Sequence, residues 1–577
     1  MSDALVRLSS LVRSKLLRLL LLATIAVYTI AMVTWVLSSR QSVALLPAHA
    51  TTEAHAATVE RPPREAPEMR QLRCVGWRAT RNCSADGARD EAQDKRCNER
   101  VESTASGYCE VEDVVSGERF RVLQRGCRTV RKRAVFTCSR APDVVAFRVE
   151  SDRVVEAVRA PAFRLPRSRT PSTEARAGIV MVVYPSLLAS VYALIRTLRE
   201  LMHCQLPIEV WYRPDEMRDV PAGLKTLEDM AEKDAVGGLT IRAIDDLRAV
   251  RFATKVHAIY NSAFDHVLFL DADNVPVRDP TFLFESEEFV RTGAVFWPDF
   301  WFPQCTMFHI VEDSLVWQLL DMPYVDMFEQ ESGQLVIDRR RHAAAMELVH
   351  FYAFHTPNLF KQLALAWGDK DLFRFAWIKL NAPFFMVQTP PAIAGKLVGD
   401  SFCGMTMVQH DASGRVLFLH RNYNKLTGRP HQHDEKHQSE PQKQVGSTQP
   451  DPDRAVVPKD AIAHANANTS AQTPLATLER ASESDELPDP AIWTHLWSFR
   501  NSSPRNDYRV VIYKAPPGFP PLQKCYGPRG LRDNEHFYAQ EFASLDFSGL
   551  ETHLRRFAME GAQLVDTFRA PMTKETR

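Results

Sequence analysis

The sequence predicts an α/β domain built on a largely parallel sheet, preceded by a transmembrane helix and a small disulfide-rich β module. Three observations lead to this fold class. From residue 178 onward, short apolar runs alternate with segments of helical periodicity. A run without charge covers 19–37, and six cysteines crowd into 74–138. The 577 residues are enough for about two to four structural units.

The apolar run at 19–37 ("LLLLATIAVYTIAMVTWVL") has close to the ~20 residues that a helix needs to cross a bilayer. Four basic residues precede it, so the positive-inside rule places 1–18 in the cytoplasm and the remaining chain across the membrane. A cleaved signal peptide is the alternative, although its apolar region is usually only about 7 to 15 residues long. The stretch 38–73 contains no aromatic residue, which indicates a solvated stem.

The clustered cysteines predict a small module at 74–140. Six cysteines beyond a membrane anchor are typical of three disulfides, with 15 possible pairings that the sequence does not distinguish. A zinc site is the alternative, but no C-x-x-C spacing occurs among them. The six are Cys74, Cys83, Cys97, Cys109, Cys127 and Cys138.

The overall charge excludes one class of partner. The chain has 71 basic and 71 acidic residues, so no basic excess points to nucleic acid. A dinucleotide or P-loop site is also disfavoured, because "VVYPS" stands at the first strand-to-helix turn where a glycine-rich motif would be expected.

The main domain is expected at 178–428. Strands are predicted at 178–183, 208–212, 239–244 and 267–270, with helices at 186–203 and 255–264 between them. The stretch 429–488 is polar and without phenylalanine or tyrosine, which is typical of a disordered insertion. We expect 489–577 to return to the main domain.

The segment "HVLFLDADNVPVRDP" carries the strongest chemical signal. Its apolar residues predict a buried strand, and Asp271 and Asp273 follow at the strand's end. Open α/β sheets bind ligands at this edge, and carboxylates at positions i and i+2 of a turn can reach one Mg²⁺ or Mn²⁺ ion. His420 ends the apolar run "VLFL" in the same way, and a neutral imidazole is a suitable third ligand for Mn²⁺.

Four segments in order resemble the fungal-type Golgi α-mannosyltransferases that extend and branch mannose-rich glycans. "FLDADNVPVRDPTFLFE" resembles the metal-site segment of that family, and "EQESGQLVIDRRRH" resembles its acceptor-side loop and strand. "WGDKDLFRFAW" is similar to the acidic segment beside the donor sugar, and "MVQHDASGRVLFLHRNYNK" is similar to the closing strand with its metal-binding histidine. The cysteine module and the long insertion depart from the fungal pattern.

This resemblance implies a GT-A fold, with GDP-mannose as the donor and Mn²⁺ or Mg²⁺ as the metal. It implies that Asp271, Asp273 and His420 bind the metal. It also implies catalytic roles for Glu331, on the acceptor side or beneath the anomeric carbon, and for Asp369 and Asp371 beside the donor sugar. Residues assigned to donor binding are Tyr184, Lys255, Asp271 and Lys425.

The apolar run at 19–37 predicts a single-pass type II membrane protein with a lumenal catalytic domain. The resemblance implies a Golgi enzyme that transfers mannose to a mannose-containing glycan, with retention at the anomeric carbon. Two alternatives remain open. One is a transferase that uses a UDP-sugar, because "VVYPSLL" does not distinguish guanine from uracil. The other is an inactive, membrane-anchored glycan-binding protein. Linkage, acceptor and oligomeric state are left open.

Overall fold

The structure is a computed structural model that describes residues 70–131, 134–168, 174–430, 486–519 and 523–569. The predicted tail, the transmembrane segment at 19–37, most of the stem and most of the insertion at 429–488 lie outside the described residues. Within the described ranges, none of the helices combines the length and the apolar character that crossing a bilayer requires.

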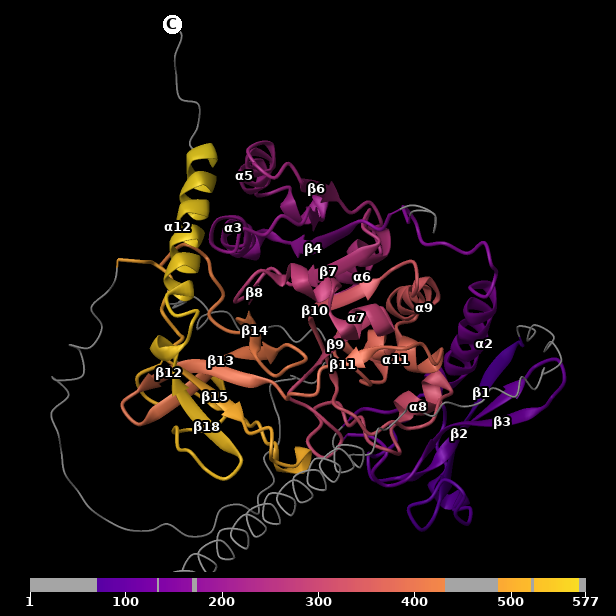
Figure 1. Ribbon diagram of the computed structural model, residues 1–577. Coiled ribbons are helices and arrows are strands. Elements are labelled where there is room, and N and C mark those ends of the chain that lie inside the picture. Colours follow the sequence, from indigo (N-terminus) through magenta and orange to yellow (C-terminus); the bar gives the residue numbers. More distant parts are fainter. Residues whose placement is uncertain (1–69, 132–133, 169–173, 431–485, 520–522, 570–577) are drawn as a thin grey trace, which may run out of the picture. The chain divides into compact units, whose positions relative to one another are not determined.

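The cysteine module is a three-stranded antiparallel sheet in the order β1-β2-β3 (Figure 1). Its cysteines form the disulfides Cys74–Cys97, Cys83–Cys127 and Cys109–Cys138. The prediction of three disulfides is thus confirmed, and the zinc alternative is wrong because no thiolate in this cluster is free to bind an ion. A sheet this small buries little apolar surface, which is why cross-links are needed to hold it. The strands are β1 (Leu72–Thr80), β2 (Ser106–Asp113) and β3 (Arg119–Arg125).

The central sheet has seven strands in the order β11-β9-β10-β7-β4-β5-β6. Its strands are β4 (Ala177–Val183), β5 (Ile208–Tyr212), β6 (Leu239–Ala243), β7 (His266–Leu270), β9 (Ala294–Pro298), β10 (Gln330–Asp338) and β11 (Phe385–Met386). The β6-β5-β4-β7 half is parallel, whereas β10 runs antiparallel to both of its neighbours. Periodicity does not reveal this reversal, since a strand buried on both faces is a continuous apolar run in either direction.

Helices pack against the sheets and against one another. The longer ones are α2 (Ala141–Ala157), α3 (Leu188–Arg196), α5 (Pro221–Glu232), α6 (Ala253–Asn261), α9 (Ala343–Phe354), α11 (Lys370–Lys379) and α12 (Leu550–Arg569). Short α-helices are α4 (Pro214–Met217), α7 (Glu287–Thr292), α8 (Leu315–Leu320) and α10 (Leu359–Gln362). Short 3₁₀ turns are η1 (Glu91–Gln93), η2 (Cys138–Arg140), η3 (Pro185–Leu187), η5 (Pro280–Phe284), η9 (Arg505–Asp507) and η10 (Phe542–Ser544).

The helix expected at 186–203 is divided. Pro185 opens a 3₁₀ turn before α3, in keeping with the fixed φ of proline at a helix start. The helix then widens into a π turn, η4 (Thr197–Leu201), where the N–H of Met202 donates to the carbonyl of Thr197 (3.1 Å). This local widening leaves no trace in the apolar pattern.

A second sheet includes β8, the short strand that follows β7 in the chain. The order β16-β17-β13-β12-β15-β18 is extended by β14, which pairs with β13 and with β8. The strands are β8 (Asn274–Pro276), β12 (Ala392–Val398), β13 (Ser401–His410), β14 (Val416–His420), β15 (His495–Phe499), β16 (Ile512–Lys514), β17 (Lys524–Tyr526) and β18 (Phe537–Glu541). The segment after the insertion therefore returns to this sheet, and its last helix, α12, packs along α3 (Figure 1).

The buried histidine at the end of β13 gives a prediction for acid stability. Burial lowers the pKa of His410 to about 4, against about 6.5 in an unfolded chain. Between these pH values the unfolded chain holds a proton that the folded chain lacks, so acid favours unfolding. We expect His410 to account for a loss of up to roughly 3 kcal/mol in unfolding free energy as the pH falls from 6.5 to 4.

Urea titrations between pH 4 and 7 measure this effect. The variant His410→Gln should lose less stability over the same range than the unsubstituted protein does. An identical pH dependence in both proteins would contradict the prediction.

Candidate metal and nucleotide-sugar site

The candidate site begins where β7 ends. The apolar residues of β7 are buried, and Asp271 and Asp273 follow at the edge of the sheet. The N–H of Asp271 donates to the carbonyl of Gly333 on β10 (2.8 Å), and the side-chain amide of Asn274 donates to the same oxygen (2.8 Å). These bonds hold the turn against β10, so both carboxylates stay at the ligand-binding edge of the sheet.

His420 reaches this edge from the second sheet. It ends β14, and the pairing of β14 with β8 places it opposite Asn274. The ligating atoms of Asp271, Asp273 and His420 all lie within 4.8 Å of one another. Gly333 leaves room for the imidazole, because a Cβ at that position would lie 2.6 Å from Nδ1 of His420. The structure thus brings together the three residues predicted as metal ligands.

Two lysines approach the carboxylates. Nζ of Lys255 lies 3.2 Å from Oδ2 of Asp271 and 3.5 Å from Oδ2 of Asp369, and Lys425 pairs with Asp273. Burial alone would lower the pKa of Lys255, but Asp271 and Asp369 raise it above its usual value. Burial would also raise the pKa of Asp273, yet Lys425 holds it well below its usual range. Lys255 and Asp273 are therefore charged at neutral pH.

The charge of the site matches a divalent cation. Four carboxylates converge on the two lysines and the imidazole: those of Asp271, Asp273, Glu331 and Asp369. Counted with all four carboxylates ionised and with His420 in the neutral form that a metal requires, the carboxylates exceed the lysines by two negative charges. Without a metal, burial opposes a proton on His420, but Asp273 favours it and the pKa of His420 is raised. Two carboxylate ligands and one imidazole are a donor set that suits Mn²⁺ and also accommodates Mg²⁺. The residues present therefore fit the metal expected from the sequence.

Glu331 and Asp369 lie on either side of Ser332. Oε1 of Glu331 accepts the N–H groups of Ser332 (3.0 Å) and Gly333 (2.7 Å), and it lies 3.7 Å from Nδ1 of His420. Oδ2 of Asp369 accepts the hydroxyl of Ser332 (3.1 Å), and Lys255 donates to the same hydroxyl (3.0 Å). Ser332 thus connects Lys255 and Asp369, predicted on the donor side, to Glu331, predicted on the acceptor side. Nothing in the sequence indicates this role of Ser332.

The remaining predicted site residues divide into two cases. Tyr184 follows β4 and is 40% exposed. Burial of its ring raises the pKa of the phenol, and the charges of Lys425 and Asp273 also act on this pKa. Tyr184 therefore lies at the same edge of the sheet as these two residues. Asp371 is fully buried, where it accepts from Arg374 (2.6 Å) and from the N–H of Gln330 (3.0 Å). The side chain of Asp371 therefore binds the start of β10 and does not face the predicted metal ligands.

A buried ion cluster centred on Lys370 continues this support. Nζ of Lys370 donates to Oε2 of Glu329 (2.9 Å) and to Asp299, and it lies 3.9 Å from Oδ2 of Asp371. All four side chains are less than a tenth exposed. The first residues of α11 thereby hold the strand that carries Glu331. Periodicity alone gave no indication of this cluster, because its members come from three separate segments.

Aromatic side chains from three separate segments of the chain pack together near Glu331, the residue predicted on the acceptor side. The rings of Tyr423 and Tyr526 are 5.4 Å apart, and Phe300 lies 5.2 Å from Tyr526. Burial above all raises the pKa of Tyr526, the neighbouring phenol of Tyr423 raises it further, and the negative charges of Asp299 and Glu331 add to the effect. The disulfide Cys403–Cys525 fixes β17, and with it Tyr526, to β13.

Comparison with known proteins identifies relatives of part of the chain. Residues 176–411 match the family described as "Mannosyltransferase putative". The chain is 29% identical to "Alpha-1,2-mannosyltransferase MNN2" of Saccharomyces cerevisiae, over 38% of this chain and 43% of that protein. It is 25% identical to "Alpha-1,2-mannosyltransferase MNN23" of Candida albicans, over 36% of this chain and 41% of that protein. The chain thus spans less than half the length of these curated relatives.

A solved structure with a similar arrangement is the galactosyltransferase LgtC in complex with donor and acceptor sugar analogs. The match has a TM-score of 0.25 and 13% sequence identity, and it covers 36% of this chain and 73% of that chain.

Proposed function

We propose, on the premise that residues 176–411 belong to a mannosyltransferase family, that the chain is a metal-dependent GT-A glycosyltransferase that moves mannose from GDP-mannose to a mannose-containing glycan. The convergence of Asp271, Asp273 and His420 within 4.8 Å is the observation that carries the proposal. Two carboxylates and an imidazole at the ligand-binding edge of an α/β sheet are what a nucleotide diphosphate with its metal requires.

The donor side of the site is assigned as follows. A divalent ion held by the three ligands would neutralise the charge that develops on the departing diphosphate. Lys255 and Lys425 would donate to phosphate oxygens of the donor. Their ammonium groups lie at this edge, beside the carboxylates of Asp271 and Asp273. Asp369 would accept hydrogen bonds from hydroxyls of the donor sugar, and Tyr184, at the exposed rim, would contact the nucleotide.

On the acceptor side, Glu331 is the carboxylate in position to orient the attacking hydroxyl. Retention at the anomeric carbon is consistent with two routes: front-face attack, in which the leaving diphosphate takes the acceptor proton, or a covalent intermediate on a carboxylate such as Glu331. Tyr423 and Tyr526 would give the acceptor sugar an aromatic surface to stack on.

The proposed location is the lumenal side of the Golgi membrane, with 19–37 as a type II anchor. Four disulfides form in the described residues, and disulfides persist in the secretory pathway and not in the cytosol. The lumenal placement of the catalytic domain rests on this chemistry.

A screen of nucleotide sugars tests the proposed function. The full chain in detergent is incubated with GDP-mannose, GDP-fucose, UDP-glucose or UDP-galactose, each with Mn²⁺ and with EDTA, and release of the nucleoside diphosphate is measured with and without α-linked mannobiose. We expect turnover with GDP-mannose and Mn²⁺ alone. Turnover of a UDP-sugar in its place would overturn the donor assignment, and the absence of turnover with every donor would overturn the enzymatic proposal.

The role of His420 gives a separate prediction. Losing an outer-sphere partner of a metal ligand already costs about 10- to 100-fold in metal affinity, so His420→Ala should raise the Mn²⁺ concentration for half-maximal activity at least as much. His420→Asp should recover part of the affinity, because it restores an oxygen ligand. His257→Ala and His410→Ala are controls, since neither imidazole is in the cluster. An unchanged Mn²⁺ dependence in His420→Ala would remove this residue from the metal site.

A further inference from the structure

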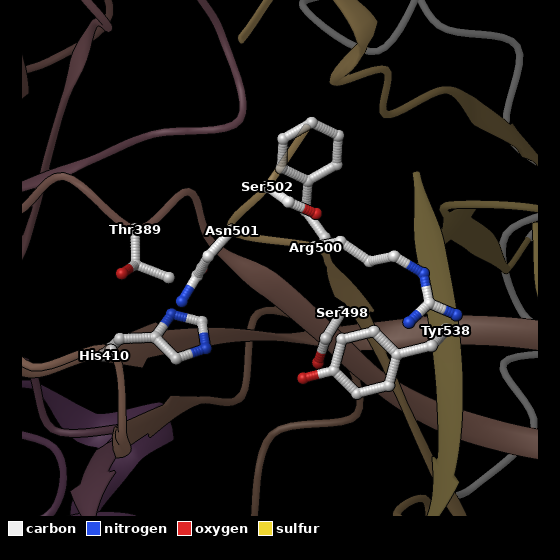
Figure 2. A pocket seen from close by; sticks show the side chains of 9 residues that line it. Thr389, His410, Ser498, Arg500, Asn501, Ser502 and Tyr538 are labelled. Atoms are coloured by element: carbon white, nitrogen blue, oxygen red, sulfur yellow. The ribbon is translucent and has the colours of Figure 1, made fainter. Parts of the chain in front are cut away.

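A cavity of about 340 Å³ lies where the end of β13 faces the turn that follows β15 (Figure 2). Segments far apart in the sequence form its walls: the loop before β12, the β13–β14 hairpin, and β15 with its neighbour β18. None of the predicted metal or donor ligands lines it. His420 on β14 pairs with Met407 on β13. His410 lies three residues beyond Met407 along β13, which is a distance of about 10 Å. The cavity is therefore separate from the metal site.

Polar groups line this cavity without partners of their own. The hydroxyls of Thr389, Ser498 and Tyr538 and the side-chain amide of Asn501 form no hydrogen bond within the part of the chain that the structure describes. Ser498 is buried, Thr389 and Tyr538 are half-buried, and Asn501 is exposed, so these groups line a recess that opens to solvent at Asn501. A ligand that both donates and accepts hydrogen bonds would satisfy them.

The charge of the walls favours an uncharged ligand. Arg500 is the one lining residue that is charged at neutral pH, and Nη2 of Arg500 lies 3.7 Å from Oδ2 of Asp533. The guanidinium also lies over the ring of Tyr538, with 5.1 Å between its carbon and the ring centroid. His410 is 5% exposed and neutral, because burial lowers its pKa to about 4. An anion such as phosphate would therefore find one cation, and that cation already faces a carboxylate.

We propose that this cavity is a second glycan site, which takes a neutral hexose unit of a mannose-containing glycan away from the point of transfer. The choice of mannose rests on the proposed function. The volume is within the ~300–1,000 Å³ of typical ligand pockets. The hydroxyls of a sugar match the hydroxyl and amide groups of Thr389, Ser498, Asn501 and Tyr538. Most of these residues lie outside the family match at 176–411, so the site belongs to the part of the domain that the C-terminal segment completes.

Binding of α-linked mannobiose to the full chain, in EDTA and without nucleotide, tests this proposal. Asn501 opens the tripeptide "NSS", which fits the acceptor pattern for N-glycans. The protein is therefore produced in a bacterial host with an oxidising compartment, which forms disulfides and adds no N-glycan there. Dissociation constants are measured by NMR titration. Thr389→Val and Tyr538→Phe each remove one hydroxyl at nearly constant volume, and each should weaken binding about two- to tenfold. Thr240→Val is the matched control, because Thr240 lies exposed on β6, away from both sites.

Glu331→Gln alters the acceptor side of the transfer site, which is the other place where mannobiose would bind, and should leave mannobiose binding to the cavity unchanged. The proposal is overturned if the unsubstituted protein does not bind mannobiose, if both cavity variants bind as the control does, or if Glu331→Gln abolishes binding. Tighter binding of inorganic phosphate than of mannobiose would also overturn it. Because neither metal nor donor is present, a failed donor screen with intact mannobiose binding would refute the transferase proposal and leave the cavity in place.

Discussion

Replacing Asp271 or Asp273 with alanine is expected to lower the rate of mannose transfer by at least about 10²- to 10³-fold while the protein remains folded. That range is the usual cost of removing one group that stabilises developing charge. Each carboxylate is one of three metal ligands at the edge of the sheet, and neither is part of the apolar core. Transfer is measured with GDP-mannose and mannobiose over a range of Mn²⁺ concentrations.

Two controls accompany this experiment. EDTA should reproduce the effect of the variants in the unsubstituted protein, and circular dichroism should show unchanged secondary structure in the variants. Asp215→Ala is a matched surface substitution, since Asp215 lies exposed in α4 and should not affect the Mn²⁺ dependence. Full activity of either variant, or of the unsubstituted protein in EDTA, would end the metal hypothesis.

The variant Lys370→Met is expected to lower the free energy of unfolding by about 3–5 kcal/mol. Removing one partner of a buried ion pair leaves the other charge without compensation, and this is the usual cost. Lys370 is surrounded by Asp299, Glu329 and Asp371, and all four side chains are buried. Burial already raises the pKa of Asp299 and of Glu329, and loss of the lysine raises both further. Urea unfolding at pH 7 measures the change.

Lys361→Met serves as the control, because Lys361 is exposed in α10 and should change stability by no more than about 0.5 kcal/mol. The double variant Lys370→Met/Glu329→Gln should recover part of the loss, since it removes one of the uncompensated charges. A loss below about 1 kcal/mol in Lys370→Met would mean that the cluster does not hold β10 in place.

Those features of the site that depend on residues close together in the chain can be predicted from the sequence. The buried strand before Asp271 and the turn after it are local features, so a short segment of sequence is enough to predict that the acids lie at the edge of the sheet. His420 ends a similar run, but only the pairing of β14 with β8 shows that it reaches the same edge, and that pairing joins residues about 150 positions apart.

Other parts of the site depend on three-dimensional packing that the sequence does not reveal. Asp369 and Asp371 look equivalent in "GDKD", yet side chains two residues apart at the start of a helix point in different directions. Asp369 faces Ser332, and Asp371 faces Arg374. The disulfide Cys403–Cys525 joins residues 122 positions apart and could not be inferred from the scattered cysteines. The same holds for Tyr526, which this bond brings beside Tyr423.

The Cys403–Cys525 bond also gives the polypeptide a closed covalent loop that contains all of 431–485. A protease that cut the backbone anywhere inside this loop would not release the C-terminal fragment, because the bond between β13 and β17 would still join the two pieces. The strands on both sides of the cut pair within one sheet, β12 with β15 and β13 with β17, so hydrogen bonding would hold the nicked halves in register. Continuity of the backbone through 431–485 is therefore dispensable for keeping His420 and Tyr526 in the same molecule.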